Sequence, residues 1–387
     1  MGNFKIKTTI VGLCLLCGVN SSALTYEEYL KQQTTQYTQY KDSYEKEFVA
    51  YKQAYADAFS EFKKDLKLKW PEKRPQVSTK HKWVEYSKDL NSRKSVDFSK
   101  KEINLEVIAK SEDEAKKKIA LMFENLVKKD VKSAYKDDIL EQKVIKKLKK
   151  KQPVIKSNQK IIVDMINAQE KQQLKNKIKS QKLIVVKHKD KFIYKANVKL
   201  PADSTIKKAK QFKDDVIRSA NKQKVPASLV YAIMHSESSF NPMARSHIPA
   251  YGLMQIVPRT AGVDSYKFLY GYKKLLSSSY LYDSKKNITI GSAYLHILYY
   301  RYLRKIKDPQ SKLYCTIAAY NTGAGNVAKA FIGNTNINKA SVKINAMSSK
   351  EVYNVLMKKL PYNETKHYLK KVTDRTSAYN KLLKTTL

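Results

Sequence analysis

One apolar helix face that ends in a carboxylic acid constrains this chain more than any other feature. Val230, Ile233 and Met234 recur at the spacing of one helix face. Glu237 lies seven residues after Val230 and falls on the same face. An ionised Glu is rarely buried without a partner, and a carboxyl group held against apolar neighbours keeps its proton to higher pH. The pattern therefore predicts a helix that presents a general acid to a cleft.

Two further polar segments lie at predicted turns. Gly252-Leu253-Met254-Gln255 precedes Pro258, a favourable first residue for a helix, so we expect Gln255 on a tight connection with its amide free. Residues 313–320 read as a helix, which the following Gly-rich run ends just after Tyr320 and Asn321. Asn287 is expected to cap the helix that follows it. These turns would project polar groups from rigid helix ends.

These motifs, in this order, resemble those of a known enzyme family. The lytic transglycosylases with a goose-type-lysozyme-like catalytic domain carry similar segments, here Glu237-Ser238-Ser239, Gly252-Leu253-Met254-Gln255, Ala319-Tyr320-Asn321, and Glu364-Thr365 with Tyr368. The resemblance covers roughly Ser204 to the C-terminus. The preceding region, with Trp70-Pro71 and Trp83-Val84-Glu85-Tyr86, is similar to the N-terminal domain of the membrane-bound murein transglycosylases of type C.

The resemblance implies a reaction that uses one carboxylate. Most glycosidases place two carboxylates beside the scissile bond, but no Asp or Glu occurs between Ser238 and Arg259. In the family, the Glu that corresponds to Glu237 protonates the glycosidic oxygen between N-acetylmuramic acid and N-acetylglucosamine. The same group then accepts the proton of the muramoyl C6 hydroxyl, which closes on C1. The expected product is a 1,6-anhydro sugar, and no water is consumed.

Three of the implied substrate contacts are Ser246 and Gln255, near the first two motifs, and Tyr320 of the third motif. Ser246 is similar to the family serine that contacts the acetamido region of the substrate. Gln255 would donate to and accept from an N-acetyl group or a peptide. The Tyr320 hydroxyl would position Glu237 or a sugar. A purely structural use of Gln255 and Tyr320 stays open.

The other implied contacts come from the end of the third motif and from the last helix. Asn321 would brace its own turn, Glu364 would contact the peptide side of the substrate, and Tyr368 would help to form the cleft. Glu364 as an ordinary solvated residue stays an alternative. His235 neighbours the acid, but no partner pattern gives it a catalytic role. The six His are scattered without a metal-ligand spacing, so we expect no metal and no cofactor.

The first residues have the pattern of an export signal. Lys5 and Lys7 precede an apolar stretch that is too short to span a membrane, and small residues at Ser21 and Ala23 fit a cleavage site. Type C transglycosylases are lipid-anchored through a cysteine, and this chain offers Cys14 or Cys17. Each follows a leucine, where lipoprotein processing prefers a small residue. We therefore expect an exported periplasmic protein that is soluble, with outer-membrane association as the alternative.

The formal net charge of +41, from 76 Lys and Arg against 35 Asp and Glu, first suggests nucleic acid. The export signal, the even spread of basic residues and the absence of a recognised nucleic-acid-binding motif argue against that partner. Peptidoglycan carries carboxylates on its stem peptides, and anionic lipid surfaces also face the periplasm. We expect peptidoglycan strands as the partner and peripheral contact with an anionic membrane, while much of the charge could equally cover solvated faces.

The chain reads as an α+β protein in four parts. After the signal peptide (1–23), aromatic residues from Tyr29 to Tyr55 recur at helical spacing, which predicts a Tyr-rich amphipathic helix over 24–69. An α+β N-terminal domain (70–200) follows, with an alternating strand at 103–107 and a hairpin over 183–198. A mostly helical lysozyme-like catalytic domain (204–387) completes the chain, with a capping box at Ser348 and Glu351.

Three functions remain open on these grounds besides the transglycosylase. A lysozyme-type hydrolase would leave reducing instead of anhydro ends. A catalytically silent wall-binding protein would keep the cleft without turnover, which the presence of Glu237 argues against. A basic nucleic-acid binder would show salt-dependent affinity for DNA.

Overall fold

The computed structural model describes residues 26–72, 75–151, 153–246 and 249–385, with side chains from Glu45 onward. Two compact units divide the chain, residues 1–47 and Phe48–Leu387, and helix α1 (Tyr26–Lys67) runs through their boundary. The predicted signal segment, with Cys14 and Cys17, lies outside the described residues. All the contacts described below belong to the second unit.

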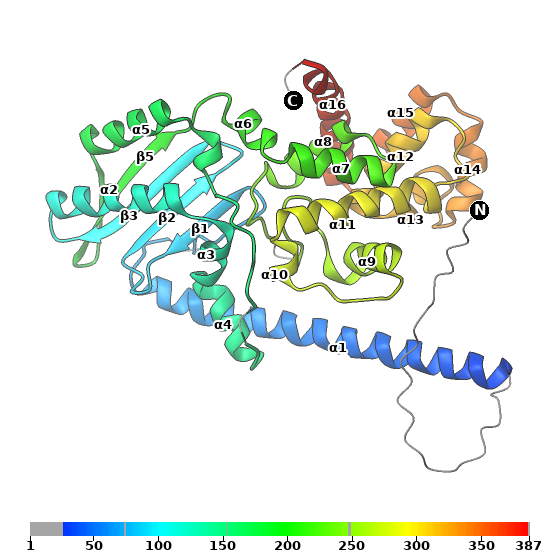
Figure 1. Ribbon diagram of the computed structural model, residues 1–387, viewed down its shortest axis with the longest axis horizontal. Coiled ribbons are helices and arrows are strands. Elements are labelled where there is room, and N and C mark those ends of the chain that lie inside the picture. Colours follow the sequence, from blue (N-terminus) through cyan, green and yellow to red (C-terminus); the bar gives the residue numbers. More distant parts are fainter. Residues whose placement is uncertain (1–25, 73–74, 152, 247–248, 386–387) are drawn as a thin grey trace, which may run out of the picture. The chain divides into compact units, whose positions relative to one another are not determined.

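An antiparallel sheet forms the N-terminal part of this unit (Figure 1). Its strand order is β1-β2-β3-β5-β4, with β1 at Lys82–Tyr86, β2 at Ser92–Asp97, β3 at Glu102–Ala109, β4 at Ile184–His188 and β5 at Lys191–Lys199. The long connection between β3 and β4 holds α2 (Glu112–Lys128), α3 (Val131–Lys136), α4 (Ile139–Lys147), the short turn η1 (Val163–Met165) and α5 (Ala168–Ser180). The predicted strand at 103–107 and the hairpin over 183–198 are both present.

Both faces of the sheet are covered, because apolar side chains alternate along its central strands. Ile103 and Leu105 of β3 are fully buried in a core that also includes Ile119 and Phe123 of α2. A second cluster on Val84, Tyr86 and Ile193 packs against α4 and the C-terminal half of α1, through Ala54, Ala58, Phe62 and Leu66. Part of α1 is thus a structural layer of the N-terminal sheet domain.

The C-terminal part is helical, which makes the whole an α+β protein. It contains α6 (Ser204–Lys210), α7 (Lys213–Gln223), α8 (Ala227–Ser238), the π-helical turn η2 (Pro258–Gly262), α9 (Val263–Tyr270), α10 (Ser278–Leu281), α11 (Ser284–His296), the π-helical turn η3 (Ile297–Tyr302), α12 (Pro309–Thr322), α13 (Ala324–Ile332), α14 (Ile337–Asn345), α15 (Ser349–Lys359) and α16 (Asn363–Thr385). Helix α8 is buried along most of its length and packs against α7, α11 and α16. It is the central helix of this part.

Helix ends follow the sequence signals with one exception. The capping box of Ser348 and Glu351 is present, and Gly323, at φ +85°, ends α12 as predicted. The prediction that Asn287 caps a helix is wrong. Asp283 accepts from the backbone N–H of Lys286 at that N-terminus, while Asn287 lies one turn inside α11 and is fully buried.

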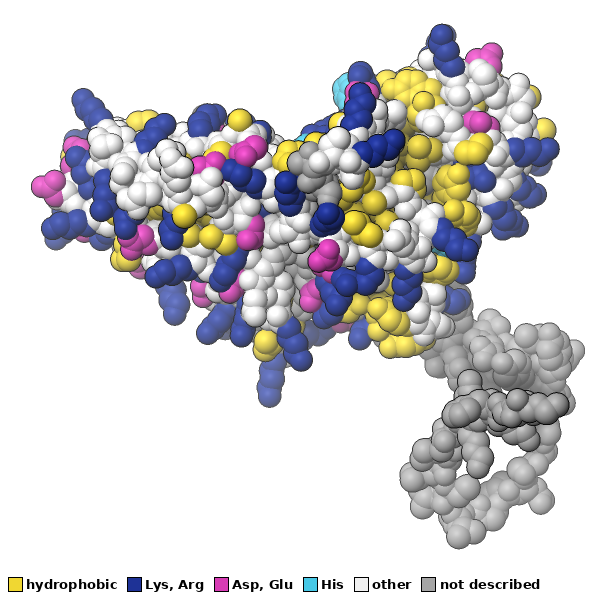
Figure 2. All heavy atoms as spheres, turned by 45° about the horizontal axis from the view of Figure 1, so that its top comes forward, with side chains coloured by type: hydrophobic (Ala, Val, Ile, Leu, Met, Phe, Trp, Pro, Cys, Tyr) yellow, Lys and Arg dark blue, Asp and Glu magenta, His cyan; other side chains and the backbone are white. Residues whose placement is uncertain are grey.

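The surface carries basic side chains over several elements. In Figure 2, Lys and Arg are spread across the visible face and are not gathered in one patch. No helix in the described part of the chain is both long and apolar enough to cross a membrane. The one cysteine in that part, Cys315, is buried in the core as a free thiol, as its apolar helical context predicts.

Candidate active site

Glu237 lies in the last turn of α8 and is only 5% exposed. The helix stops directly after it because Ser239 and Phe240 take left-handed backbone conformations, with φ of +52° and +63°. The Ser238 hydroxyl donates to the carbonyl oxygens of both Met234 and Leu253. The end of the helix is thereby fixed to the loop that carries the second motif, and the acid is presented from a rigid position.

The surroundings of Glu237 favour the protonated form of its carboxyl group. Burial raises the pKa of this carboxyl above its ordinary value, and the charge of Glu364 raises it further. The ammonium group of Lys80, 3.7 Å from Glu237 Oε2, lowers the pKa, as does the nearby Tyr368 hydroxyl. The net result is a raised pKa, with desolvation as the largest cause. A carboxyl group in this state can act as a general acid near neutral pH.

The loop of the second motif is a tight turn, as predicted. Gly252 and Gln255 have positive φ, and the N–H of Gln255 donates to the Gly252 carbonyl. The Gln255 amide is not wholly free, which corrects the prediction: its Nε2 also donates to the Gly252 carbonyl at 3.0 Å. Its Oε1 is buried and has no hydrogen-bond partner among the described residues. The turn therefore holds a buried acceptor that no described donor satisfies.

The Asn287 side chain supports this loop through three hydrogen bonds, a role that the prediction of a helix cap did not include. Its Oδ1 accepts from the Met254 N–H at 2.9 Å, and its Nδ2 donates to the carbonyls of Tyr251 and Leu281 at 2.8 Å. Gly252 is required at the same place, because a Cβ there would lie 2.3 Å from Asn287 Nδ2 and from the Leu281 carbonyl. The shape of the loop depends on this buried amide.

Tyr320 and Asn321, at the end of α12, brace neighbouring segments. The Tyr320 hydroxyl donates to the Met254 carbonyl at 2.8 Å, so it supports the second-motif loop. Burial, followed by the charge of Glu237, raises the pKa of Tyr320 well above its ordinary value, which places this hydroxyl near the acid. Asn321 Oδ1 accepts from Thr365 Oγ1 at 2.7 Å and thus joins α12 to α16.

Helix α16 brings two predicted site residues to the acid. Tyr368 is 8% exposed, and its hydroxyl lies near enough to the Glu237 carboxyl to lower the pKa of that group. Glu364, one turn earlier, is exposed but close enough to raise the same pKa. The predicted i and i+4 relationship therefore directs one buried hydroxyl and one solvated carboxylate at the same site.

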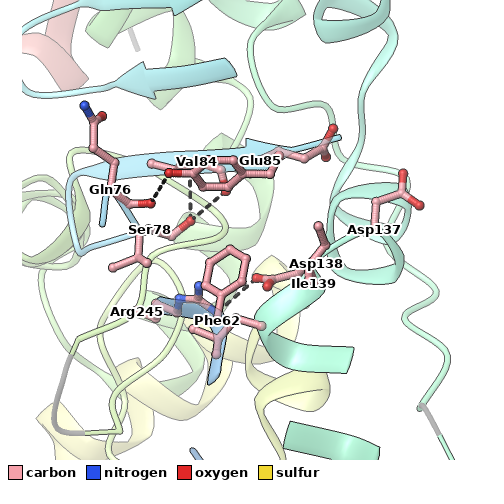
Figure 3. Close-up of a pocket in the computed structure, with 12 residues that line it drawn as sticks. Phe62, Gln76, Ser78, Val84, Glu85, Asp137, Asp138, Ile139 and Arg245 are labelled. Atoms are coloured by element: carbon pink, nitrogen blue, oxygen red, sulfur yellow. Dashed lines mark hydrogen bonds and ion pairs between the residues drawn. The ribbon is translucent and has the colours of Figure 1, made fainter. Parts of the chain in front are cut away.

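Ser246 lies in a loop anchored on the N-terminal domain. Its backbone N–H donates to the Ala250 carbonyl, and the preceding Arg245, 5% exposed, pairs through Nη1 with Asp138 of the N-terminal domain at 3.0 Å. Figure 3 shows the side chains of Arg245 and Asp138 pointing toward one another beside a cavity of about 20 Å³. A cavity of this size can hold about one water molecule, which would satisfy the buried Arg245 Nε.

His235 is a structural residue. Its Nδ1 lies 3.0 Å from the Tyr379 hydroxyl, and burial, with the nearby charges of Arg375 and Lys371, lowers its pKa to about 3. His81 is similar, since burial lowers its pKa to about 4. Both rings are therefore neutral at neutral pH. Among the described residues, no group of three or more His, Cys, Asp or Glu side chains is arranged to hold a metal ion.

We expect His235 to make the protein sensitive to acid. An unfolded His titrates near 6.5 but the native ring only near 3, so the unfolded state binds more protons between these values. The stabilisation is complete above about pH 6.5 and is lost as the pH falls below it. From pH 7 to pH 5, the free energy of unfolding of the wild type should fall on the order of 1 to 2 kcal/mol more than that of His235→Asn. Urea unfolding at both pH values measures the difference, and equal decreases in the two proteins would contradict it.

Comparisons with known proteins agree with this geometry. Residues 215–343 match the family model of the transglycosylase SLT domain, and residues 48–211 match that of the N-terminal domain of membrane-bound lytic murein transglycosylase C. The residues similar to the SLT domain of lytic transglycosylases therefore include the buried acid at the end of the central helix.

Individual relatives carry the same name. Membrane-bound lytic murein transglycosylase C from Serratia proteamaculans (strain 568) is 42% identical over 175 residues, and that from Yersinia pestis (strain Pestoides F) is 43% identical over 175 residues. Each match covers 45% of this chain and 48% of the relative, so the chain spans about half the length of the curated relatives it matches. The structure of the 70 kDa soluble lytic transglycosylase from Escherichia coli is 17% identical, with a TM-score of 0.36, over 70% of this chain and 44% of that one.

Proposed function

We propose that this chain cleaves the β-1,4 bond between N-acetylmuramic acid and N-acetylglucosamine in peptidoglycan and forms 1,6-anhydromuramic acid ends without water. The observation that carries the proposal is the state of Glu237: a carboxyl 5% exposed, with a raised pKa, at the rigid end of a buried helix. The match of residues 215–343 to the SLT domain supports the same reaction.

In the first step Glu237 transfers its proton to the glycosidic oxygen. The bond from C1 of muramic acid to that oxygen breaks, and the N-acetylglucosamine part leaves with a neutral hydroxyl. Proton transfer from a positioned side chain of this kind contributes about 10² to 10⁴-fold to the rate. The acid is suited to this step because burial disfavours its charged form.

In the second step the Glu237 carboxylate accepts the proton of the muramoyl C6 hydroxyl while that oxygen bonds to C1. The enzyme returns to its starting protonation state, so a single carboxyl group serves as acid and then as base. Another carboxylate that influences Glu237 is that of Glu364, which is exposed and lies on α16. The acetamido group of the substrate would stabilise the positive charge at C1 in place of a second catalytic carboxylate.

The remaining site residues bind and position the glycan. Gln255 Oε1, which has no hydrogen-bond partner in the described part of the chain, would accept from an acetamido or peptide N–H. Ser246 would contact the acetamido region, and Glu364 the peptide side of the substrate. Tyr368 would form a wall of the cleft beside the acid. Tyr320 would act through the second-motif loop that it supports, and Asn321 through its bond to Thr365 on α16.

The cellular site follows from the substrate. A peptidoglycan enzyme with the export pattern of residues 1–23 acts in the periplasm, and its net charge of +41 favours contact with the carboxylates of the wall and with anionic membrane surfaces. Association with the outer membrane, through a lipid on Cys14 or Cys17, is the alternative to a soluble periplasmic form.

Product analysis tests the reaction class. The purified chain is incubated with isolated sacculi, and the released muropeptides are separated and weighed by mass spectrometry. We expect muropeptides that end in 1,6-anhydromuramic acid, 18 mass units lighter than the hydrolysed forms because no water is added. Reducing muramic acid ends would instead identify a lysozyme-type hydrolase. Binding to sacculi without any release would identify a silent wall-binding protein.

A further inference from the structure

The N-terminal domain contributes a cation to the site of the acid. Lys80 lies just before strand β1, within the match to the N-terminal family model, and its Nζ is 3.7 Å from Glu237 Oε2 on α8. On the basis of the proposed function, we infer that Lys80 is a positioning residue that orients the Glu237 carboxylate and stabilises its charge between the two proton transfers. Lys80 is thus a means by which the N-terminal domain controls the chemistry of the SLT domain.

The backbone around Lys80 is held from both domains. The Lys80 carbonyl accepts from Asn241 Nδ2 at 3.3 Å, and the Thr79 carbonyl accepts from the Arg245 N–H at 3.4 Å. His81 Nδ1 lies 3.1 Å from Ser239 Oγ. Three consecutive residues of the N-terminal domain therefore contact the loop that follows α8.

The sheet fixes the other side of the same segment. The Thr79 N–H donates to the Lys82 carbonyl at 2.7 Å, and the Phe98 N–H donates to the His81 carbonyl at 2.9 Å. The Lys80 main chain is therefore placed before its side chain makes any contact. A flexible lysine on a fixed backbone loses less conformational freedom on pairing than one on a mobile loop.

Several charged or titratable groups face Glu237 from the elements packed around it. They are Lys80 before β1, Tyr320 on α12, and Glu364, Tyr368 and Lys371 on α16. Within the described part of the chain, Lys80 makes the ion pair with Glu237. Burial and the charge of Arg375 lower the pKa of Lys371, although the charge of Glu237 raises it. Lys80 is the cation with the largest lowering effect on the Glu237 pKa.

In the proposed reaction Glu237 must hold its proton at first and then persist as a carboxylate, and the position of Lys80 serves the second requirement. A fully desolvated carboxyl group holds its proton firmly and is unstable once the proton has left. The reaction requires the carboxylate to persist until the C6 hydroxyl delivers its proton. A cation about 4 Å away stabilises that carboxylate, and because the Lys80 side chain is 36% exposed, water moderates the effect.

The decisive variant is Lys80→Met, which keeps the length of the side chain and removes its charge. Loss of the cation raises the pKa of Glu237, so the protonated acid persists to higher pH. We expect the alkaline limb of the kcat/KM profile to shift to higher pH by about 0.5 to 1 pH unit. At pH 7, kcat should fall about 3- to 10-fold while KM changes less than about 2-fold, since the intermediate carboxylate is less stable.

Two matched variants separate charge from structure. The Lys80→Arg variant keeps a cation, so the alkaline limb of its kcat/KM profile should lie within about 0.2 pH unit of the wild-type position. Lys88→Met removes one exposed positive charge from the turn after β1 and should leave both the profile and kcat unchanged. A Lys80→Met profile identical to the wild type, or an equal upward shift in Lys88→Met, would overturn the inference. Higher activity of Lys80→Met at all pH values would also overturn it, since Lys80 would then obstruct the site.

A direct titration keeps this test independent of the proposed reaction. Glu237 can be assigned in protein labelled with ¹³C at the Glu side-chain carboxyl, by comparison with Glu237→Gln, and followed by NMR from pH 4 to 9. The Glu237 signal should titrate at higher pH in Lys80→Met than in the wild type, whether or not sacculi are cleaved. Coincident titrations would refute the role of Lys80. A shifted titration without release of anhydro products would instead refute the proposed function alone.

Discussion

Glu237→Gln should reduce the release of muropeptides from sacculi at least about 100-fold at pH 7, because the amide can neither donate the proton to the glycosidic oxygen nor accept one from the C6 hydroxyl. The substitution conserves the size of the side chain, and burial already favours the neutral form of the carboxyl group. We therefore expect the thermal midpoint of unfolding to stay within about 2 °C of the wild type. The rate of release, measured by chromatography, and a melting curve together give both quantities.

Glu364→Gln is the matched control for this variant. It makes the same chemical change at an exposed carboxylate of α16 that influences the same site. We expect a decrease of less than about 10-fold, because Glu364 would contribute to binding and not to proton transfer. Cleavage by Glu237→Gln within about 3-fold of the wild type, or a larger loss in Glu364→Gln, would show that the acid has been assigned to the wrong residue.

The second large effect is expected at a residue that would not touch the glycan. Asn287→Ala removes three buried hydrogen bonds, and leaves the Met254 N–H and the carbonyls of Tyr251 and Leu281 without this partner. The Tyr251 carbonyl keeps the Ile256 N–H as a donor at 3.1 Å. Each group that is left unsatisfied costs about 1 to 3 kcal/mol, part of which relaxation recovers. The free energy of unfolding should fall by about 2 to 4 kcal/mol. Urea unfolding at pH 7 measures this change.

The rate of peptidoglycan cleavage by Asn287→Ala should fall together with its stability, since Asn287 supports the loop that carries Gln255. A displacement of about 1 Å in a positioning group can reduce the rate about 100-fold. Asn326→Ala is the control: among the described residues its amide donates to Thr322, one turn earlier, and Asn326 is not placed at the site. We expect that variant to lose less than about 1 kcal/mol and less than 2-fold in cleavage. Equal losses in the two variants would mean that the loop does not depend on Asn287.

The local features of the site were predictable because they rest on short-range patterns. The spacing of Val230, Ile233 and Met234 placed Glu237 on a buried helix face, where the structure has it. Gly252 and Pro258 predicted the turn at Gln255, since backbone conformation there depends on residue type. Catalytic and substrate-binding roles for the site residues stay predictions, as do the domain boundaries at 69–70 and 201–203.

Other parts of the site could not be predicted from the same patterns. Asn287 has the residue type of a helix cap, but Asp283 takes that position and Asn287 instead bonds to a loop more than 30 residues earlier. The role of Tyr320 in positioning Glu237 or a sugar stays a prediction, but the bond of its hydroxyl to the Met254 carbonyl is one that the sequence does not indicate. A hydroxyl or an amide can serve many partners equally well, so its sequence context does not select one.

The sequence by itself determined that Glu237 lies on the buried face of its helix and where the chain turns around it, because helical periodicity and the backbone preferences of Gly and Pro act over a few residues. Only the tertiary structure decided what surrounds the acid. Lys80 comes from another domain, and Tyr368 from the last helix. The pKa of a buried carboxyl depends on distances of a few ångströms to such groups, and packing alone sets those distances.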